Sequence, residues 1–193
     1  MPILPIIIAP DPRLKTKSFL VEKVDAEIKN LVRDMFETMY DARGIGLAAV
    51  QVGVHKRVLV ADVEWNGSRY GDDAEDAIVY GKQHVLINPE LVSDAGDEHI
   101  YKEGCLSFPE QYAEVTRPSG IRVKFLDLDG KQREESFDGL LATCIQHEID
   151  HLNGITFVDH ISSVKRDMIT RKLTKLKKMG AFEPHVHGEH CNH

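Results

Sequence analysis

Apolar residues recur at helical spacing between residues 139 and 152. They are Leu140, Leu141, Cys144, Ile145, Ile149 and Leu152. Steps of three and four residues place these positions on one side of an α-helix, and that side is expected to be buried. Asp138 can cap the start of the helix, and Gly154 can end it. The pattern predicts one long helix at the centre of the molecule.

Two more helices are predicted, one toward each end of the chain. The first is capped by Asp25, should end near Arg43, and has as its buried positions Ile28, Leu31, Val32, Met35, Phe36 and Met39. The second is capped by Ser162. Its apolar positions, which are expected to face the core, are Val164, Met168, Ile169, Leu173 and Leu176.

Most of the remaining chain has the character of β-structure. After an extended segment at residues 3–9, strands are expected at 58–63, 84–89, 91–93, 98–102, 112–116, 121–126, 132–137 and 155–158. Asp129-Gly130 suits a hairpin turn between two of them. Residues 44–53, rich in small side chains, indicate a helix-to-strand turn, and the polar stretch 64–82 indicates a surface insertion. The predicted fold class is α+β, with antiparallel β-sheets packed around the central helix and a helix at each end.

Composition and charge limit the functions that need to be considered. The 193 residues are 42% apolar and 28% charged, as in ordinary globular proteins. We expect a single domain over residues 1–179 and a flexible, His-rich tail over 180–193. The formal charge of −7 argues against a general nucleic-acid binder. Residues 162–179, however, contain seven Lys or Arg and one Asp, a local balance of +6.

The cysteine content and the amino-terminal segment indicate in which cellular compartment the protein is expected. Three cysteines cannot all pair within one chain, so reduced thiols are expected. Residues 1–10 are apolar but short, and prolines interrupt them, which fits neither a signal peptide nor a membrane span. A cytoplasmic protein without membrane contact is the interpretation that agrees with both features.

The central helix carries the residues with the clearest chemical signature. His147 and His151 are four residues apart, so a helix stacks their side chains one turn apart on the same side. That spacing lets two imidazoles bind one metal ion, while Glu148 beside them can move a proton. Histidines on the core side of a helix without a partner would also be unfavourable. The pattern therefore favours a metal site over coincidence.

The third protein ligand is not fixed by this pattern. An extended metalloprotease motif would place it at residue 157, but Phe157 cannot bind a metal. Cys144 lies about 10 Å of helix rise from His151 and points toward the helix start, so packing is its expected role. Asp150 and Asp159 stay open as alternatives.

Three sequence blocks together resemble the peptide deformylase family, most closely its bacterial type. They are GIGLAAVQ at residues 44–51, EGCLS at 103–107 and QHEIDH at 146–151, and the likeness extends over residues 3–176. Two features depart from the family pattern. The 64–82 stretch is longer than in compact bacterial members, and Tyr112 stands where some members have an arginine near the substrate.

The resemblance implies a metal centre and a reaction. Cys105, His147 and His151 would bind one divalent ion, usually Fe²⁺ in the family, with Zn²⁺, Ni²⁺ or Co²⁺ able to replace it. The substrate would be a nascent peptide that begins with N-formylmethionine, hydrolysed to formate and a free amine. Glu148 would move the proton. The side-chain amide of Gln51 and the N–H of Leu106 would donate to the developing oxyanion.

The resemblance also implies how the peptide is held. Gly44 and Gly46 would let the main chain approach the substrate closely. Ile45 and Gly104 would pair with the peptide as an added strand. The methionine pocket would be shaped by Ile45, Leu140, Thr143, Cys144 and His147.

The helix pattern is also compatible with two other classes of function. A different zinc hydrolase, such as an aminopeptidase, could share the helix pattern by convergence and would act on free amino termini. A structural metal domain would need a fourth protein ligand that closes the coordination shell, and it would not need Glu148 or Gln51.

For the favoured enzyme we expect a monomer, with the basic closing helix docking on the ribosome near the exit tunnel.

Overall fold

The computed structural model describes residues 2–67 and 78–182, and most of the predicted tail (180–193) and of the predicted insertion (64–82) lies outside them. The strands are β1 (Gly46–Ala48), β2 (Val58–Ala61), β3 (His84–Cys105), β4 (Phe108–Leu126) and β5 (Gln132–Asp138). The helices are α1 (Ala26–Asp41), α2 (Gly139–Leu152) and α3 (Ser163–Lys178), with short 3-10 turns at Pro12–Lys15, Ala49–Val52 and Phe157–His160. This content confirms the α+β class.

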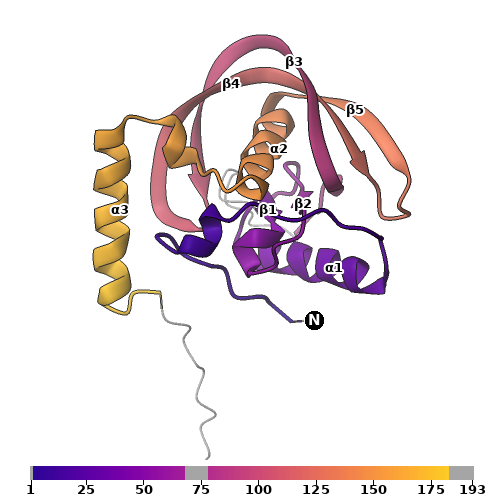
Figure 1. The fold of residues 1–193 in the computed structure, drawn as a ribbon. Helices are drawn as coiled ribbons and strands as arrows, with labels where there is room; N and C mark the ends of the chain where they lie inside the picture. The colour runs from indigo at the N-terminus through magenta and orange to yellow at the C-terminus, as the bar shows by residue number, and fades with distance from the viewer. Residues whose placement is uncertain (1, 68–77, 183–193) are drawn as a thin grey trace, which may run out of the picture.

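All five strands belong to one antiparallel sheet, in the order β1-β2-β3-β4-β5. β3 and β4 are long and bent, and they arch over α2 (Figure 1). The sequence predicted several short strands here, and that division was wrong. Register shifts between β3 and β4, such as those at Ile87/Glu90 and Ala95/Glu98, interrupt the alternation without ending the ladder. A β-bulge bends a strand in this way, so its sequence resembles two separate strands.

The predicted strand at residues 155–158 was also wrong. The 3-10 helix Phe157–His160 occupies this place. The carboxylate of Asp159 accepts from the N–H of Thr156 at 2.8 Å, and the N–H of Asp159 donates to the carbonyl of Thr156 at 2.8 Å. This reciprocal capping of one short turn is a local hydrogen-bond effect that hydrophobic alternation does not reveal.

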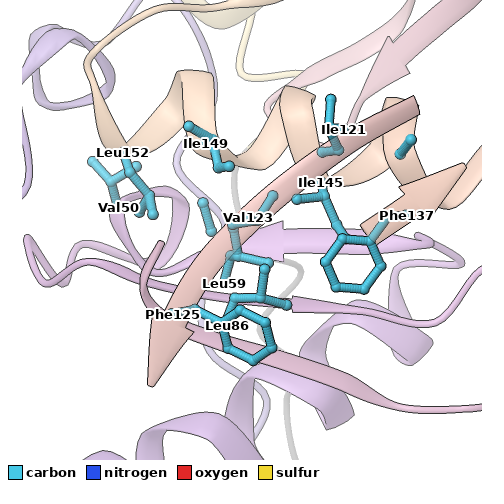
Figure 2. Packing of buried hydrophobic residues seen from close by; sticks show 12 residues of the cluster. Val50, Leu59, Leu86, Ile121, Val123, Phe125, Phe137, Ile145, Ile149 and Leu152 are labelled. Carbon is cyan, nitrogen blue, oxygen red and sulfur yellow. The ribbon is translucent and has the colours of Figure 1, made fainter. Parts of the chain in front are cut away.

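Helices α1 and α2 lie where the sequence predicts them, but the side chain of Asp138 makes no capping hydrogen bond at the start of α2. The Asp25 carboxylate accepts from the N–H of Ile28 at 3.1 Å and caps α1. The apolar side of α2 packs against the sheet (Figure 2), in a cluster that includes Ile145, Ile149, Leu152, Leu59, Leu86, Ile121 and Val123. The rest of the circumference of α2 is also buried and holds Gln146, His147 and Glu148. The helix is therefore enclosed almost all round, with its polar side chains inside the molecule.

The predicted inner face of α3 was partly wrong. Leu173 is fully buried, but Val164 and Met168 are 68% and 66% exposed. At 3.6 residues per turn, these two positions lie roughly 100–140° around the helix from Ile169, which faces the core. α3 stands at the side of the molecule and contacts it along a narrow line (Figure 1). None of the described helices is long and apolar enough to cross a lipid bilayer.

The narrow attachment of α3 predicts a sharp contrast between two substitutions. Leu173→Ala should destabilise the protein by about 2–5 kcal/mol, because it opens a cavity at a buried site. Met168→Ala should change stability by no more than about 0.5 kcal/mol. Chemical denaturation of both variants measures the difference, and equal losses would show that α3 packs on a different face.

Candidate active site

Two histidines of α2 and one cysteine of β3 meet in the interior. His147 and His151 are one turn apart, and their ring centroids are 4.9 Å apart. Cys105 is the last residue of β3, and its Sγ lies 3.2 Å from Nε2 of His151. Potential ligand atoms of the three side chains, all buried, lie within 4.8 Å of one another. The end of a strand and one face of a helix thus form a compact group of donors.

This group suits a tetrahedral divalent metal ion. With zinc-like bond lengths, a thiolate sulfur and an imidazole nitrogen on adjacent corners lie about 3.6 Å apart. The separation between Cys105 and His151 is close to that value. Burial lowers the pKa of His151 and so favours the neutral ring that a metal ligand must have. Within the described part of the chain the group has three ligands, the number that catalytic zinc sites use.

The two aspartates that the sequence left open are engaged elsewhere. Asp150 accepts from Arg117 at 2.9 Å, and its carboxylate lies 2.7 Å from Nε2 of His160. Asp159 accepts from the N–H and the hydroxyl of Thr156. Neither aspartate belongs to the group of donors around Cys105. The geometry therefore favours Cys105 as the third ligand.

The other buried cysteine of the described chain, Cys144, is a packing residue with a neutral thiol. Burial raises its pKa well above the usual range, and the charge of Glu148 raises it further. Its Sγ lies 3.5 Å from the carbonyl oxygen of Ile45, as a weak donor would. Cys144 therefore touches the strand wall of the site, as the sequence suggested, and stays outside the donor group.

Glu103 and Arg117 complete the site, and sequence patterns did not identify either. A carboxylate oxygen of Glu103 lies 2.9 Å from Nδ1 of His147, which leaves Nε2 of that ring for a metal. Arg117 donates to Glu103 at 2.5 and 3.1 Å. Burial alone would raise the pKa of Glu103, but hydrogen bonds from His147 and Arg117 lower it to about 2. The sequence offered one indication of Glu103: it lies two residues from Cys105 on a strand, and such residues have side chains on the same face.

Gln51 directs its amide nitrogen toward the donor group. Its Oε1 accepts from the N–H of Ala48 at 2.8 Å, which fixes the orientation of the amide. The Nε2 atom lies 3.5 Å from Sγ of Cys105 and 3.2 Å from the hydroxyl of Ser107. The side chain is 1% exposed. A hydrogen-bond donor is thus held in place beside the candidate metal centre.

Position 46 has to be glycine because two side chains of α2 approach its main chain closely. A Cβ atom at this position would lie 2.5 Å from Sγ of Cys144 and 2.7 Å from Oε1 of Glu148. The main chain of β1 therefore runs directly against two side chains of α2. Substitution of Gly46 would displace the carboxylate of Glu148, which adjoins the three candidate ligands.

A pocket opens onto this group and brings together nearly all of the predicted site residues. Its lining consists of Ile45, Gly46, Gln51, Tyr101, Glu103, Gly104, Cys105, Leu106, Leu140, Thr143, Cys144, His147 and Glu148. His151 lies deeper, and Gly44 lies behind the side chain of Leu106, which is 2.7 Å from where a Gly44 Cβ would be. Tyr101 was not predicted, although it shares the inner face of β3 with Glu103.

A carboxylate next to three donors that could hold a metal ion, beside a pocket, is the arrangement of a mononuclear metallohydrolase, and the fold and site together indicate that class. Comparison with known proteins narrows the class. The family described as polypeptide deformylase matches residues 3–167. The chain belongs to this family, whose members are enzymes.

Individual relatives agree. A peptide deformylase of Rhizorhabdus wittichii is 54% identical over 92% of this chain and 97% of its own. One from Mesorhizobium japonicum is 53% identical over 92% and 95%. Among solved structures, the Legionella pneumophila enzyme has a TM-score of 0.80 at 46% identity, covering 95% of this chain and 100% of that one. The Ehrlichia chaffeensis enzyme in complex with actinonin has a TM-score of 0.81 at 44% identity, covering 92% and 99%.

The choice of ligand can be tested with the two buried cysteines as a matched pair. Cys105→Ser should strip or greatly weaken metal binding, because it removes a thiolate from the donor group. Cys144→Ser should retain about one metal ion per chain. Metal analysis of the purified variants decides between them, and an empty Cys144→Ser protein would refute the assignment.

The supporting role of Glu103 gives a second prediction. Glu103→Gln should lower metal affinity by about 10–100-fold, since the partner that orients His147 becomes neutral. Glu98→Gln, at an exposed position of the same strand, is the control and should leave affinity unchanged. Competition with a chelator gives both affinities, and equal values would contradict the role.

Proposed function

We propose that this chain removes the N-formyl group from the N-terminal formylmethionine of newly synthesised proteins and releases formate. One observation carries the proposal. A group formed by Cys105, His147 and His151 adjoins Glu148 and Gln51 in one pocket, in a chain of the peptide deformylase family.

The chemistry divides between the bound ion and the side chains. A divalent ion held by Cys105, His147 and His151 would supply Lewis-acid chemistry, which acidifies water and polarises a carbonyl. Glu148 takes a proton from the attacking water and later delivers it to the leaving nitrogen, so that the formyl C–N bond breaks and a neutral amine leaves. Gln51 donates its amide N–H to the developing oxyanion, and the main-chain N–H of Leu106 is the second donor.

The peptide is proposed to bind as an extra strand along β1. β1 lies at the edge of the sheet. The carbonyl of Ile45 already accepts from the N–H of Asp62 at 2.9 Å, on the β2 side. Successive residues of a strand direct their N–H and C=O groups to alternate sides, so the main chain of Gly46, in place of the Ile45 expected from the resemblance, faces the open edge. Gly104 also lines the pocket, and the extended peptide is proposed to pair with it as well.

The methionine side chain is proposed to enter the adjoining part of the pocket. Leu140, Thr143 and Cys144 of α2 line it together with Ile45 and the ring of His147. Thr143 presents a hydroxyl that already donates to the carbonyl of Gly139 at 3.2 Å. With that polar group engaged, the wall is predominantly apolar and matches an unbranched thioether.

We further propose Fe²⁺ as the native ion, with Zn²⁺, Ni²⁺ or Co²⁺ able to replace it. A thiolate with two imidazoles suits all four ions, so ligand type does not select among them. An iron–thiolate centre that opens onto a pocket is sensitive to oxygen, and reduced thiols persist best in the cytoplasm. A reducing cytoplasmic compartment therefore agrees with the proposed ion.

Formate release distinguishes this function from a related hydrolase. The metal-loaded protein, prepared under low oxygen, should release formate from a formyl-Met tripeptide and no amino acid from the same peptide with a free amino terminus. Glu148→Ala should keep its metal but lose nearly all turnover, because the carboxylate moves protons and is not a ligand. Release of methionine from the free peptide would instead indicate an aminopeptidase, and near-normal turnover by Glu148→Ala would refute the mechanism.

Docking on the ribosome is proposed for the basic face of α3. Arg171, Lys172, Lys175 and Lys178 are exposed on this helix, whereas the protein as a whole carries a formal charge of −7. A concentrated positive charge on an acidic body creates a local field suited to RNA phosphate near the exit tunnel. We propose that a monomer docks in this way, since the enzyme must meet its substrate as it emerges.

Reversal of this charge gives the corresponding test. Changing Arg171, Lys172, Lys175 and Lys178 to Glu should abolish co-sedimentation with ribosomes at low salt and leave activity on short formyl peptides intact. A matched control reverses four exposed lysines elsewhere, Lys17, Lys23, Lys29 and Lys131. If both variants lose ribosome binding equally, the change in net charge explains the loss, and α3 is not a specific binding site.

A further inference from the structure

Ile45 and Gly46 line the pocket, and the main chain of residues 44–46 is hydrogen-bonded to the segment that follows β2. The carbonyl of Gly44 accepts from the indole N–H of Trp65 at 2.8 Å. The N–H of Gly44 donates to the carbonyl of Met39, at the end of α1, also at 2.8 Å. The carbonyl of Ile45 accepts from the N–H of Asp62. These three hydrogen bonds help to fix this short piece of main chain, and the one from Trp65 is made by a side chain.

Trp65 is itself held firmly. It is 4% exposed, and the ring of Tyr40 meets it edge-on at a centroid distance of 5.0 Å. Tyr40 in turn stacks on Phe36 of α1 at 5.9 Å. A Cβ atom at Gly67 would lie 2.3 Å from the indole, so the chain turns closely over the ring. The indole therefore has a fixed position from which to donate.

The buried Asp62 ties this segment to the body of the protein independently of Trp65. Its carboxylate accepts from the hydroxyl of Tyr40 at 2.8 Å and from the N–H groups of Gly81 and Glu64 at 3.0 and 3.1 Å. Tyr40 and Trp65 thus belong to one cluster, but of these two side chains only that of Trp65 donates to residues 44–46. This difference makes Tyr40 a suitable control.

The opposite side of residues 44–46 faces the reacting groups. Gly46 lies against the thiol of Cys144 and the carboxylate of Glu148. Gly44 lies against the side chain of Leu106, whose Cδ1 is 2.7 Å from where a Cβ would be. A small displacement of this main chain would therefore move the edge that the peptide is proposed to use.

We infer that Trp65 is a positioning residue for substrate binding: its indole N–H fixes the main chain of Gly44 to Gly46 in the geometry that pairs with the peptide. This role rests on the proposed function. The contact acts before and during the reaction alike, so it supports binding of the substrate and of the transition state equally. Its loss should therefore raise KM and leave kcat nearly unchanged.

The test compares two substitutions that each remove one hydrogen bond from the same cluster. Trp65→Phe keeps an aromatic ring but removes the N–H that Gly44 accepts. Its KM for a formyl-Met tripeptide should rise about tenfold, with kcat within about twofold of wild type and metal content unchanged. Tyr40→Phe should lose stability to a similar degree and keep the wild-type KM. Equal KM values in all three proteins, or equal increases in both variants, would overturn the positioning role.

A second measurement needs no substitution. The chain contains one tryptophan, so the intrinsic emission of the wild-type protein reports on Trp65. Actinonin, which is bound in the Ehrlichia chaffeensis structure, should shift this emission on titration if residues 44–46 contact the ligand, and unchanged emission would count against the role. Absence of formate release by the metal-loaded wild type would remove the proposed function and the positioning role together. Normal wild-type turnover with an unaltered Trp65→Phe KM would remove the positioning role alone.

Discussion

The buried pairing of Arg117 with Glu103 and Asp150 is the interaction on which the rest of the site depends. Helix α2 carries its polar residues toward the interior, and β3 adds a carboxylate there. Removing one partner of a buried ion pair costs about 3–5 kcal/mol, because the remaining charge is left without compensation. Arg117 donates to both carboxylates, so one cation on β4 neutralises groups from β3 and α2. The pair therefore holds the sheet and the helix together at the point where the candidate ligands converge.

This arrangement separates two tasks along the same helix. One side of α2 is part of an apolar cluster that fixes its position against the sheet. The other side presents His147, Glu148 and His151 to a donor from a different element. Since Cys105 and His147 are far apart in sequence, the group forms only when β3 and α2 are packed, and metal binding is coupled to folding.

Regular patterns in the sequence predicted α1, α2 and the two histidines, because helical periodicity and residue type are local properties. Cys105 was predicted only through the resemblance of its sequence block to the family. The β3–β4 pair was harder, since bulges break the alternation by which a strand is recognised. The inner face of α3 was only partly correct, because a helix at the rim needs few apolar contacts and can leave Met168 exposed. Glu103, Tyr101 and Trp65 act through contacts with distant residues, and no local pattern encodes such contacts. The roles of the individual site residues remain predictions.

The open edge of β1 restricts the period during which a substrate chain can be deformylated. An edge strand that receives its substrate as a further strand can accept only a chain whose first residues are extended and not yet hydrogen-bonded. A newly made protein that has already buried its amino terminus in its own fold cannot offer such a segment. Under the proposed mode of binding, deformylation competes with the folding of the substrate, and chains that fold quickly around their first residues leave the shortest interval for it.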